Sequence, residues 1–466
     1  MIRTADAYRA SLADGRRVFY RGERVKDVVA DSELRVAVDH SSIAFDLSHD
    51  PELRDLAVDV VDGEECSAFY TVPRSAADLR RRSHLIEAAA RAGGGMIVLK
   101  EVGTDALFGL LRSLGGEALE RARAFHRHCQ RSDLAVAVAQ TDVKGDRSLP
   151  PHRQTDPDLY VHVVDEDSDS IVVRGAKCHT SASPNCDELI VLPTRAMGPE
   201  DADYAVSFAV PVDTAGLSFY VSSYSGGERN EFEFPISSRH KMLETLTVFD
   251  DVVVPKDRVF LCREPELAGP VALSFVGYHR FTAISYKLPL LDIIVGAATL
   301  VAEANGTSRA GHVRDKLAQL IAYAETVRGL AELAATRAEV DDRGMAHPDP
   351  LTVNMAKYTF AHGFHGAIAM LVDLAGGLLV TAPGGEDWNN PEIRPVLEKY
   401  FTAAVPAEER LRLMHLISDL TARDFGGYQA VLAAHAEGSL EAEKLQLLRS
   451  YDAGPATAYA RRLAKI

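Results

Sequence analysis

The chain has 466 residues, of which 47% are hydrophobic and 25% are charged, and its formal net charge at pH 7 is −16. This composition is typical of a soluble globular protein, and the length predicts two or three subdomains rather than one core. The acidic balance argues against a protein that binds nucleic acid or anionic membranes through a basic surface.

The cysteines and the apolar segments indicate where the protein works. The five cysteines are scattered and never have CxxC spacing, which favours reduced thiols over disulfides or a zinc site. Residues 1–25 mix charges with short apolar groups, unlike a secretory signal. The most apolar stretch, 288–304, contains Asp292 and is expected to be too short to span a bilayer. These features predict a cytoplasmic enzyme.

The first 265 residues change periodicity once. Residues 75–136 carry apolar side chains at three- and four-residue intervals, which predicts amphipathic helices. The glycines at 93–95 and VGTDAL at 102–107 interrupt this pattern and predict loops or close backbone approach. Between about 138 and 265, short β-branched runs predict a compact antiparallel β domain. The acidic stretch 165–170 predicts a solvated hairpin turn rather than a metal loop.

Helical periodicity returns after residue 266 and continues to the C-terminus. The order of helices, strands and helices predicts an α+β protein. Its expected parts are a mainly helical N-terminal domain (1–137), a β domain (138–266) and a C-terminal helical domain (267–466). Functional sites are common at the junctions between such domains.

Three polar stretches could carry chemistry. TDVKGDRS at 141–148 offers backbone amides and a guanidinium to a phosphate or a planar ring, and RGAKCHTSAS at 174–183 ends a strand with several donors. Taken alone, 141–148 is more typical of an exposed turn, and 174–183 is at least as typical of a polar turn that ends a strand. In GYHRFTAISYK at 277–287, a helix would place His279 and Tyr286 on one face. A lone histidine more often pairs inside a core than catalyses, and the sequence pattern alone leaves both roles open.

These stretches occur in order with DGRRVFYRGERVKDV near the start, FDDVVVPKDRVFLC and ARDFGGYQAV. Together they resemble the 4-hydroxyphenylacetate 3-monooxygenase and 4-hydroxybutyryl-CoA dehydratase family over nearly the whole chain, with the dehydratase branch nearer. The resemblance implies an acyl-CoA-dehydrogenase-like fold that binds FAD between the β domain and the C-terminal helices, usually as a homotetramer. It assigns ten residues to the flavin: Thr141, Asp146, Arg147, Ser148, His179, Thr180, Ser181 and the turn Gly426, Gly427 and Tyr428.

The chain departs from both branches of the family. The dehydratases hold a [4Fe–4S] cluster with three cysteines and a histidine; His279 matches the histidine, but Ile97, Glu101 and Tyr286 replace the cysteines. Because the other irons of a cluster need thiolates, we predict no iron–sulfur centre. Glu244 matches one functional glutamate of the dehydratases, whereas Val431 replaces the second.

The monooxygenases bind the phenol through an arginine, a tyrosine and a histidine. Lys100 or Glu101, Asp105 and Val138 stand at these positions here. This departure argues against 4-hydroxyphenylacetate itself and leaves room for a different hydroxylation substrate.

The sequence therefore predicts an FAD-dependent oxidoreductase that uses reduced flavin from a separate reductase, because no GxGxxG nucleotide motif is present. We expect a monooxygenase that acts on a small aromatic or acyl substrate. His279 would be the acid–base or orienting group, and Tyr286, Lys287, Glu101 and Glu244 would shape the substrate side. Two alternatives remain. One is a redox-neutral isomerase, dehydratase or cyclase, whose substrate could be an acyl thioester, and the other is a non-catalytic flavin or ligand carrier.

Overall fold

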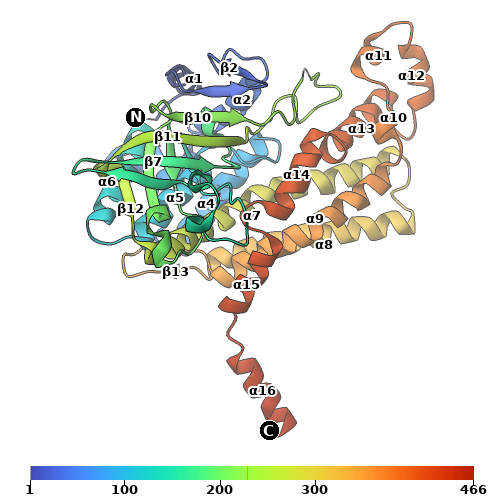
Figure 1. Ribbon diagram of the computed structural model, residues 1–466. Coiled ribbons are helices and arrows are strands. Elements are labelled where there is room, and N and C mark those ends of the chain that lie inside the picture. Colours follow the sequence, from blue (N-terminus) through green and yellow to red (C-terminus); the bar gives the residue numbers. More distant parts are fainter. Residues whose placement is uncertain (1, 228) are drawn as a thin grey trace.

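The computed structural model describes residues 2–227 and 229–466. Two packed β-sheets lie beside the long helices of the C-terminal half, and the last helix extends away from the rest of the chain (Figure 1). The expected order of helices, strands and helices is confirmed.

The N-terminal part combines helices with short strands. Ser75 starts one of these helices, because its side chain accepts a hydrogen bond from the backbone N–H of Asp78. The elements are α1 (Ala5–Ser11), β1 (Val18–Tyr20), β2 (Glu23–Val25), α2 (Arg35–Asp46), α3 (Arg54–Ala57), β3 (Val58–Val61), β4 (Glu64–Ser67), α4 (Ala76–Ala92), α5 (Lys100–Ser113) and α6 (Gly116–Ser132).

The segment VGTDAL is helical, and the expectation of a loop there is wrong. It lies inside α5, where the close-approach alternative holds instead: a Cβ on Gly103 would come within 2.3 Å of the Val136 carbonyl oxygen. Packing against the neighbouring strand therefore outweighs the low helix propensity of glycine.

The middle part forms most of the two sheets. Its strands are β5 (Val136–Ala139), β6 (His162–Glu166), β7 (Ser170–Lys177), β8 (Glu188–Val191), β9 (Val206–Pro211), β10 (Leu217–Val221), β11 (Thr245–Pro255) and β12 (Val259–Cys262). One sheet has the order β2-β1-β10-β11-β7-β6 and the other the order β12-β9-β8-β5. Their pairs are antiparallel except for β1 with β10 and β5 with β8. β1 and β2 thus extend the larger sheet with residues from the N-terminal part.

The acidic stretch 165–170 joins two antiparallel strands, which confirms the predicted hairpin turn. The side chain of Asp167 accepts hydrogen bonds from the backbone N–H groups of Asp169 and Ser170. These bonds close the turn. Short 3-10 helices connect other elements at Ala68–Tyr70, Pro151–Arg153, Pro157–Leu159, Ser183–Asn185, Pro199–Tyr204 and Lys256–Arg258.

The C-terminal part is helical apart from one small hairpin. Its elements are α7 (Pro265–Ala304), α8 (Gly311–Thr336), β13 (Glu339–Val340), β14 (Ala346–His347), α9 (Pro350–Ala375), α10 (Leu378–Thr381), α11 (Gly385–Asn389), α12 (Arg394–Phe401), α13 (Ala407–Thr421), α14 (Asp424–His435), α15 (Leu440–Ser450) and α16 (Gly454–Ala464).

Helix α7 is the central element of the molecule. It places Tyr286 in the core under the sheets, Phe275 in the core around α5 and α6, and Ile284 in the core of the C-terminal helices. Its 40 residues exceed the apolar stretch that the sequence suggested, and by length and composition alone it could cross a bilayer. The expectation of too short a segment is therefore wrong, but 67% of its most apolar window is buried within the protein, as in a core helix.

Candidate functional site

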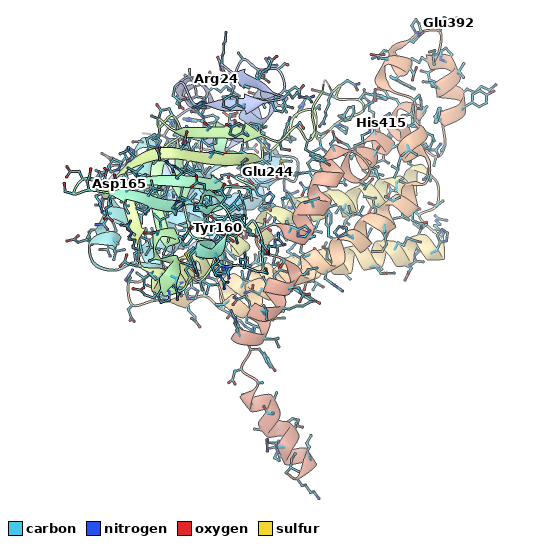
Figure 2. All side chains as sticks on the ribbon, viewed as in Figure 1. Arg24, Tyr160, Asp165, Glu244, Glu392 and His415 are labelled. Atoms are coloured by element: carbon cyan, nitrogen blue, oxygen red, sulfur yellow. The ribbon has the colours of Figure 1, made fainter. Side chains whose placement is uncertain are left out.

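Glu244 lies at the junction between the sheets and the C-terminal helices, as Figure 2 shows. It directly precedes β11, and its carboxylate accepts hydrogen bonds from the hydroxyl of Tyr428 on α14 at 2.7 Å and from Ser181 Oγ at 2.9 Å. Burial raises the pKa of Glu244, and these two donors oppose that effect. Three segments that are far apart in the sequence therefore meet at one carboxylate.

A second buried carboxylate, Glu437, lies in the loop between α14 and α15. The hydroxyl of Tyr286 donates to its Oε1, and Nζ of Lys287 lies 2.8 Å from its Oε2. Nζ of Lys357 lies 3.5 Å from the same Oε2. Glu437 has a φ of 55°, a left-handed conformation that points to tertiary contacts holding it in place.

The charged and polar side chains around Glu437 shift one another's pKa values. Burial would raise the pKa of Glu437, but the two lysines outweigh burial and lower it to about 2. Burial lowers the pKa of Lys287 to about 8, although the negative charge of Glu437 opposes this. Burial, with the Glu437 carboxylate, raises the pKa of Tyr286 well above its ordinary value. Lys287 can therefore exchange a proton near neutral pH, a property typical of functional sites.

His279 stacks on Phe275, with ring centroids 5.0 Å apart, and 16% of its side chain is exposed. Its Nδ1 lies 3.3 Å from Oδ2 of Asp105, while the other oxygen of Asp105 accepts from Thr282 at 2.8 Å and from Arg82 at 2.7 Å. With Nδ1 held by this carboxylate, Nε2 is the ring nitrogen left for contact with another group. His279 is thus neither a simple core residue nor an isolated surface histidine.

Glu101 is fully buried on α5, one turn before Asp105. Its oxygens have no well-aligned hydrogen bond among the described residues, although the backbone amides of Glu101 and Val98 lie near enough to affect its titration. Burial dominates and raises the pKa of Glu101 to about 8. Glu101 is therefore a carboxylic acid at neutral pH and can donate a proton.

The pairing of α5 with α7 brings the predicted substrate-side residues into one region. Gly109 packs against Phe275 while Asp105 reaches His279, so the two helices are antiparallel. Glu101, one turn earlier, consequently faces the part of α7 that leads to Tyr286. The charge of Glu244 also contributes to the raised pKa of Tyr286, so these two groups are within electrostatic reach.

The donor set at this place does not fit an iron–sulfur cluster. Ile97 is an apolar residue, Glu101 supplies a carboxyl and Tyr286 a phenol, so His279 has no thiolate partner. Among residues 2–227 and 229–466, no group of three or more His, Cys, Asp and Glu side chains is arranged to hold a metal ion.

The loop predicted to contact a flavin is partly closed on itself. Oδ1 of Asp146 accepts hydrogen bonds from the backbone N–H and the hydroxyl of Ser148, and both residues are exposed together with Arg147. Thr141 lies nearer the sheet, where its carbonyl accepts from the Cys178 N–H at 2.8 Å. The described contacts do not join Asp146, Arg147 or Ser148 to Glu244.

The strand end after β7 is directed toward α14. Burial lowers the pKa of His179, with further electrostatic contributions from Lys144 and His435, which places the loop, the strand end and α14 near one another. Thr180 is buried, and its Oγ1 has no hydrogen-bond partner among the described residues.

These groups fit a flavin ring, whose carbonyl oxygens and ring nitrogens accept hydrogen bonds. Thr180 Oγ1 and Gln429 Nε2 are buried atoms without partners in the described part of the chain. They adjoin Ser181 and Tyr428, which both bind Glu244. Because an unpaired buried donor costs free energy, a ligand that accepts from these groups would relieve that cost.

The predicted turn at 426–428 is part of helix α14, and the expectation of a turn is wrong. A Cβ on Gly426 would lie 2.7 Å from the Leu420 carbonyl oxygen, and one on Gly427 would lie 2.3 Å from the Tyr224 hydroxyl. Both glycines therefore allow close packing within the protein. Only Tyr428 of the three reaches the Glu244 carboxylate.

Sequence reasoning missed Glu437 and Lys357. Lys357 stands within the largely apolar stretch of α9, where a fully buried lysine indicates a partner elsewhere in the fold. Glu437 precedes a glycine in a polar loop and carries no local sign of burial.

Comparison with known proteins gives a consistent result along the whole chain. A model described as 4-hydroxyphenylacetate 3-hydroxylase N terminal matches residues 4–261, and one described as 4-hydroxyphenylacetate 3-hydroxylase C terminal matches residues 268–465. The 4-hydroxybutyryl-CoA dehydratase/vinylacetyl-CoA-Delta-isomerase of Clostridium aminobutyricum is 31% identical over 96% of each chain. The 4-hydroxyphenylacetate 3-monooxygenase oxygenase component of Thermus thermophilus is 30% identical over 88% of this chain and 86% of its own.

Solved structures show the same relationship as the sequence comparisons. The oxygenase component of 4-hydroxyphenylacetate 3-monooxygenase, complexed with FAD and 4-hydroxyphenylacetate, has a TM-score of 0.93 and 28% identity, covering 99% of this chain and 98% of that one. Butyryl-CoA dehydrogenase from Megasphaera elsdenii has a TM-score of 0.52 at 14% identity over 88% of this chain and 97% of that one, a likeness of fold alone. The expected acyl-CoA-dehydrogenase-like fold is confirmed.

Proposed function

The chain belongs to the 4-hydroxyphenylacetate 3-hydroxylase family, and on that basis we propose that it is the oxygenase component of a two-component flavin-dependent monooxygenase without an iron–sulfur cluster. Its substrate would be a small aromatic or acyl compound. FAD, reduced by a separate flavin reductase, would supply the electrons that activate dioxygen.

One observation carries this choice within the family. At the places that the resemblance assigns to cluster thiolates, the chain has the Glu101 carboxyl and the Tyr286 phenol, and Tyr286 is hydrogen-bonded to Glu437. These groups bind and exchange protons but offer no soft ligand for iron. The same fold holds FAD and a phenolic compound in the solved oxygenase relative.

The side chains have distinct roles in the proposed site. Asp105 would hold His279 so that its free ring nitrogen receives or returns a proton at the substrate. Glu437 would keep Lys287 and Tyr286 in place, with Lys287 as the group that exchanges its proton near neutral pH. Thr180 and Ser181 would orient the flavin from the end of β7, and the surrounding apolar side chains would exclude water.

A redox-neutral reaction is the second candidate, since the relative with 31% identity is a dehydratase and isomerase. The high pKa of Glu101, a result of burial, would let it donate a proton to a leaving hydroxyl. Both curated relatives compared above are enzymes, which argues against a non-catalytic carrier.

The experiment that separates the two reactions measures their different requirements. For the monooxygenase, product from a set of simple phenols should require dioxygen, FAD, NADH and a flavin reductase together. For the redox-neutral enzyme, 4-hydroxybutyryl-CoA should lose water without oxygen and with oxidised FAD. Turnover of the thioester alone would overturn the monooxygenase proposal.

We further propose that the protein acts in the cytoplasm as a homotetramer with a flavin reductase as its partner. The five free cysteines are consistent with a reducing compartment. Helix α16 extends away from the rest of the chain (Figure 1), and it exposes Tyr459, Leu463 and the adjoining Ile466. Apolar side chains on a projecting helix suit contact with a neighbouring subunit. Light scattering of the full chain would measure the assembly.

A further inference from the structure

Two histidines that are 200 residues apart in the chain face each other beside the candidate site. His40 belongs to α2, and His240 belongs to the segment that leads into β11. Their Nδ1 atoms are 3.2 Å apart, and the rings meet edge to face with centroids 5.3 Å apart. One of these two nitrogens must therefore donate to the other.

The backbone of Ile97 determines which nitrogen donates. Nε2 of His40 lies 2.7 Å from the Ile97 carbonyl oxygen, and since a carbonyl can only accept, this Nε2 carries a proton. His40 is 1% exposed, and burial lowers its pKa to about 4, so the ring is neutral at pH 7. Its Nδ1 is then an acceptor, and Nδ1 of His240 is the donor. Nε2 of His240 is left with a free lone pair.

Two glycines make room for the pair. A Cβ on Gly93 would lie 2.9 Å from Cε1 of His40, and one on Gly94 would lie 2.6 Å from Cδ2 and 3.2 Å from Nε2 of His240. Gly94 also has a φ of 64°, which disfavours any other residue. The glycines at 93–95, one of the breaks seen in the sequence, thus confirm close approach, and Gly93 and Gly94 leave the space that the two rings occupy.

His240 is also one of the residues that line a pocket next to the candidate site. Nε2 of His240 has no hydrogen-bond partner among residues 2–227 and 229–466. The pocket combines apolar side chains with hydroxyls, an ammonium and a carboxylate, and its lining includes Met96, Ser222, His240, Lys241, Glu244 and Tyr428. It therefore reaches the carboxylate on which the strand end and α14 converge.

We propose that Nε2 of His240 accepts a hydrogen bond from an O–H or N–H group of the substrate, and that His40 is a positioning residue that fixes the required tautomer. This inference rests on the proposed function, since it assigns the donor group of the substrate to the pocket beside Glu244, whose volume of about 30 Å³ admits a small polar group. The donor could be the hydroxyl of a phenol or an amide N–H in the arm of an acyl thioester. In either case the site selects substrates that carry a donor at this position.

The tautomer can be measured without turnover. Nitrogen-15 NMR of the full chain labelled at histidine, with His240→Asn to assign the signals, should show His240 protonated at Nδ1 and unprotonated at Nε2. His40→Phe should redistribute the proton on His240. A wild-type His240 protonated at Nε2 would overturn the inference, whatever reaction the enzyme catalyses.

Binding then tests the substrate contact and separates the two sources of the donor. The probes are 4-hydroxyphenylacetate and other simple phenols, each with its O-methyl ether, and 4-hydroxybutyryl-CoA. Each probe is titrated by calorimetry against the FAD-loaded protein. His240→Asn keeps a donor toward His40 but removes the acceptor at the Nε2 position, so it should weaken a donor-bearing probe about tenfold. The O-methyl ether should bind both proteins equally.

His240→Gln, which restores an acceptor near Nε2, should recover part of the affinity. A loss confined to the phenol identifies a hydroxyl as the donor, and one confined to the thioester identifies an amide. Equal binding of every probe to wild type and His240→Asn, or no binding of either donor-bearing probe, would overturn the inference. Oxygen-dependent turnover is measured in a separate assay. Failure of the proposed reaction can therefore be distinguished from failure of the proposed contact with His240.

Discussion

Lys287 and Glu437 form an ion pair of 2.8 Å in which 1% and 3% of the two side chains are exposed. Glu437 also lies 3.5 Å from Nζ of Lys357, which Glu443 approaches to 3.6 Å, so Glu437 helps to offset two buried ammonium groups. Glu437→Gln keeps the shape but leaves both lysines without that charge. We expect the free energy of unfolding to fall by about 3–5 kcal/mol, as for other broken buried pairs. Chemical denaturation measures the change.

The matched control is Glu441→Gln in the following helix. Glu441 pairs with Lys444, and 77% of its side chain is exposed. The free energy of unfolding of that variant should fall by less than about 1 kcal/mol, as is typical of surface pairs. Equal losses in the two variants would contradict a special role for Glu437.

Glu101 should make stability depend on pH. Burial raises its pKa in the folded chain to about 8, while the unfolded group titrates near its ordinary value. Between these values the folded state holds more protons, so stability is greatest below the unfolded pKa and falls as pH rises toward about 8. Glu101→Gln should flatten the decline between pH 6.5 and 8, a range above the ordinary histidine pKa. Chemical denaturation of both proteins across this range measures the free energy of unfolding at each pH. If the two proteins show the same dependence on pH, the raised pKa of Glu101 is refuted.

His279→Ala should reduce turnover by about a hundredfold or more if the ring exchanges a proton with the substrate. Asp105 and Phe275 hold the ring from two sides, so the defect should appear in kcat while FAD binding is retained. His312→Ala, at an exposed position of α8, is the control and should behave as wild type. Normal turnover with lowered stability would reduce His279 to a structural role.

Thr180→Val removes a buried hydroxyl that has no partner in the described part of the chain. The protein without FAD should gain about 1 kcal/mol in stability, because the cost of an unpaired polar atom disappears. FAD should bind about tenfold more weakly if the hydroxyl donates to the flavin. Thr299→Val, on an exposed part of α7, should change neither quantity. Unchanged FAD affinity would remove Thr180 from the cofactor site.

Protein purified without oxygen should contain no stoichiometric iron, because the positions assigned to thiolates hold Ile97, Glu101 and Tyr286. Metal analysis by mass spectrometry measures this. About four irons per chain would show that other side chains supply the ligands.

Local patterns predicted much of the fold, because periodicity and turn chemistry act within a few residues. The hairpin at 165–170 and the helix that carries His279 follow from such patterns. The break predicted at Gly103 failed because contact with Val136, 33 positions along the chain, stabilises the helix instead.

The candidate site was harder to predict, because its decisive contacts join distant positions. Lys287 and Glu437 are 150 residues apart, and no local pattern links them. His40 and His240 are 200 residues apart and became a pair only through the space left by two glycines. The resemblance supplied His279 and Glu244 individually, whereas their partners required coordinates.

Helix α7 contributes side chains to the core under the sheets, to the core around α5 and α6, and to the core of the C-terminal helices. Loss of structure in any one of these regions therefore removes packing from the other two. The chain should melt as a single cooperative unit with one calorimetric endotherm, despite its length. A substitution that frays this helix near Tyr286 should therefore also loosen packing at the far end of the helical bundle.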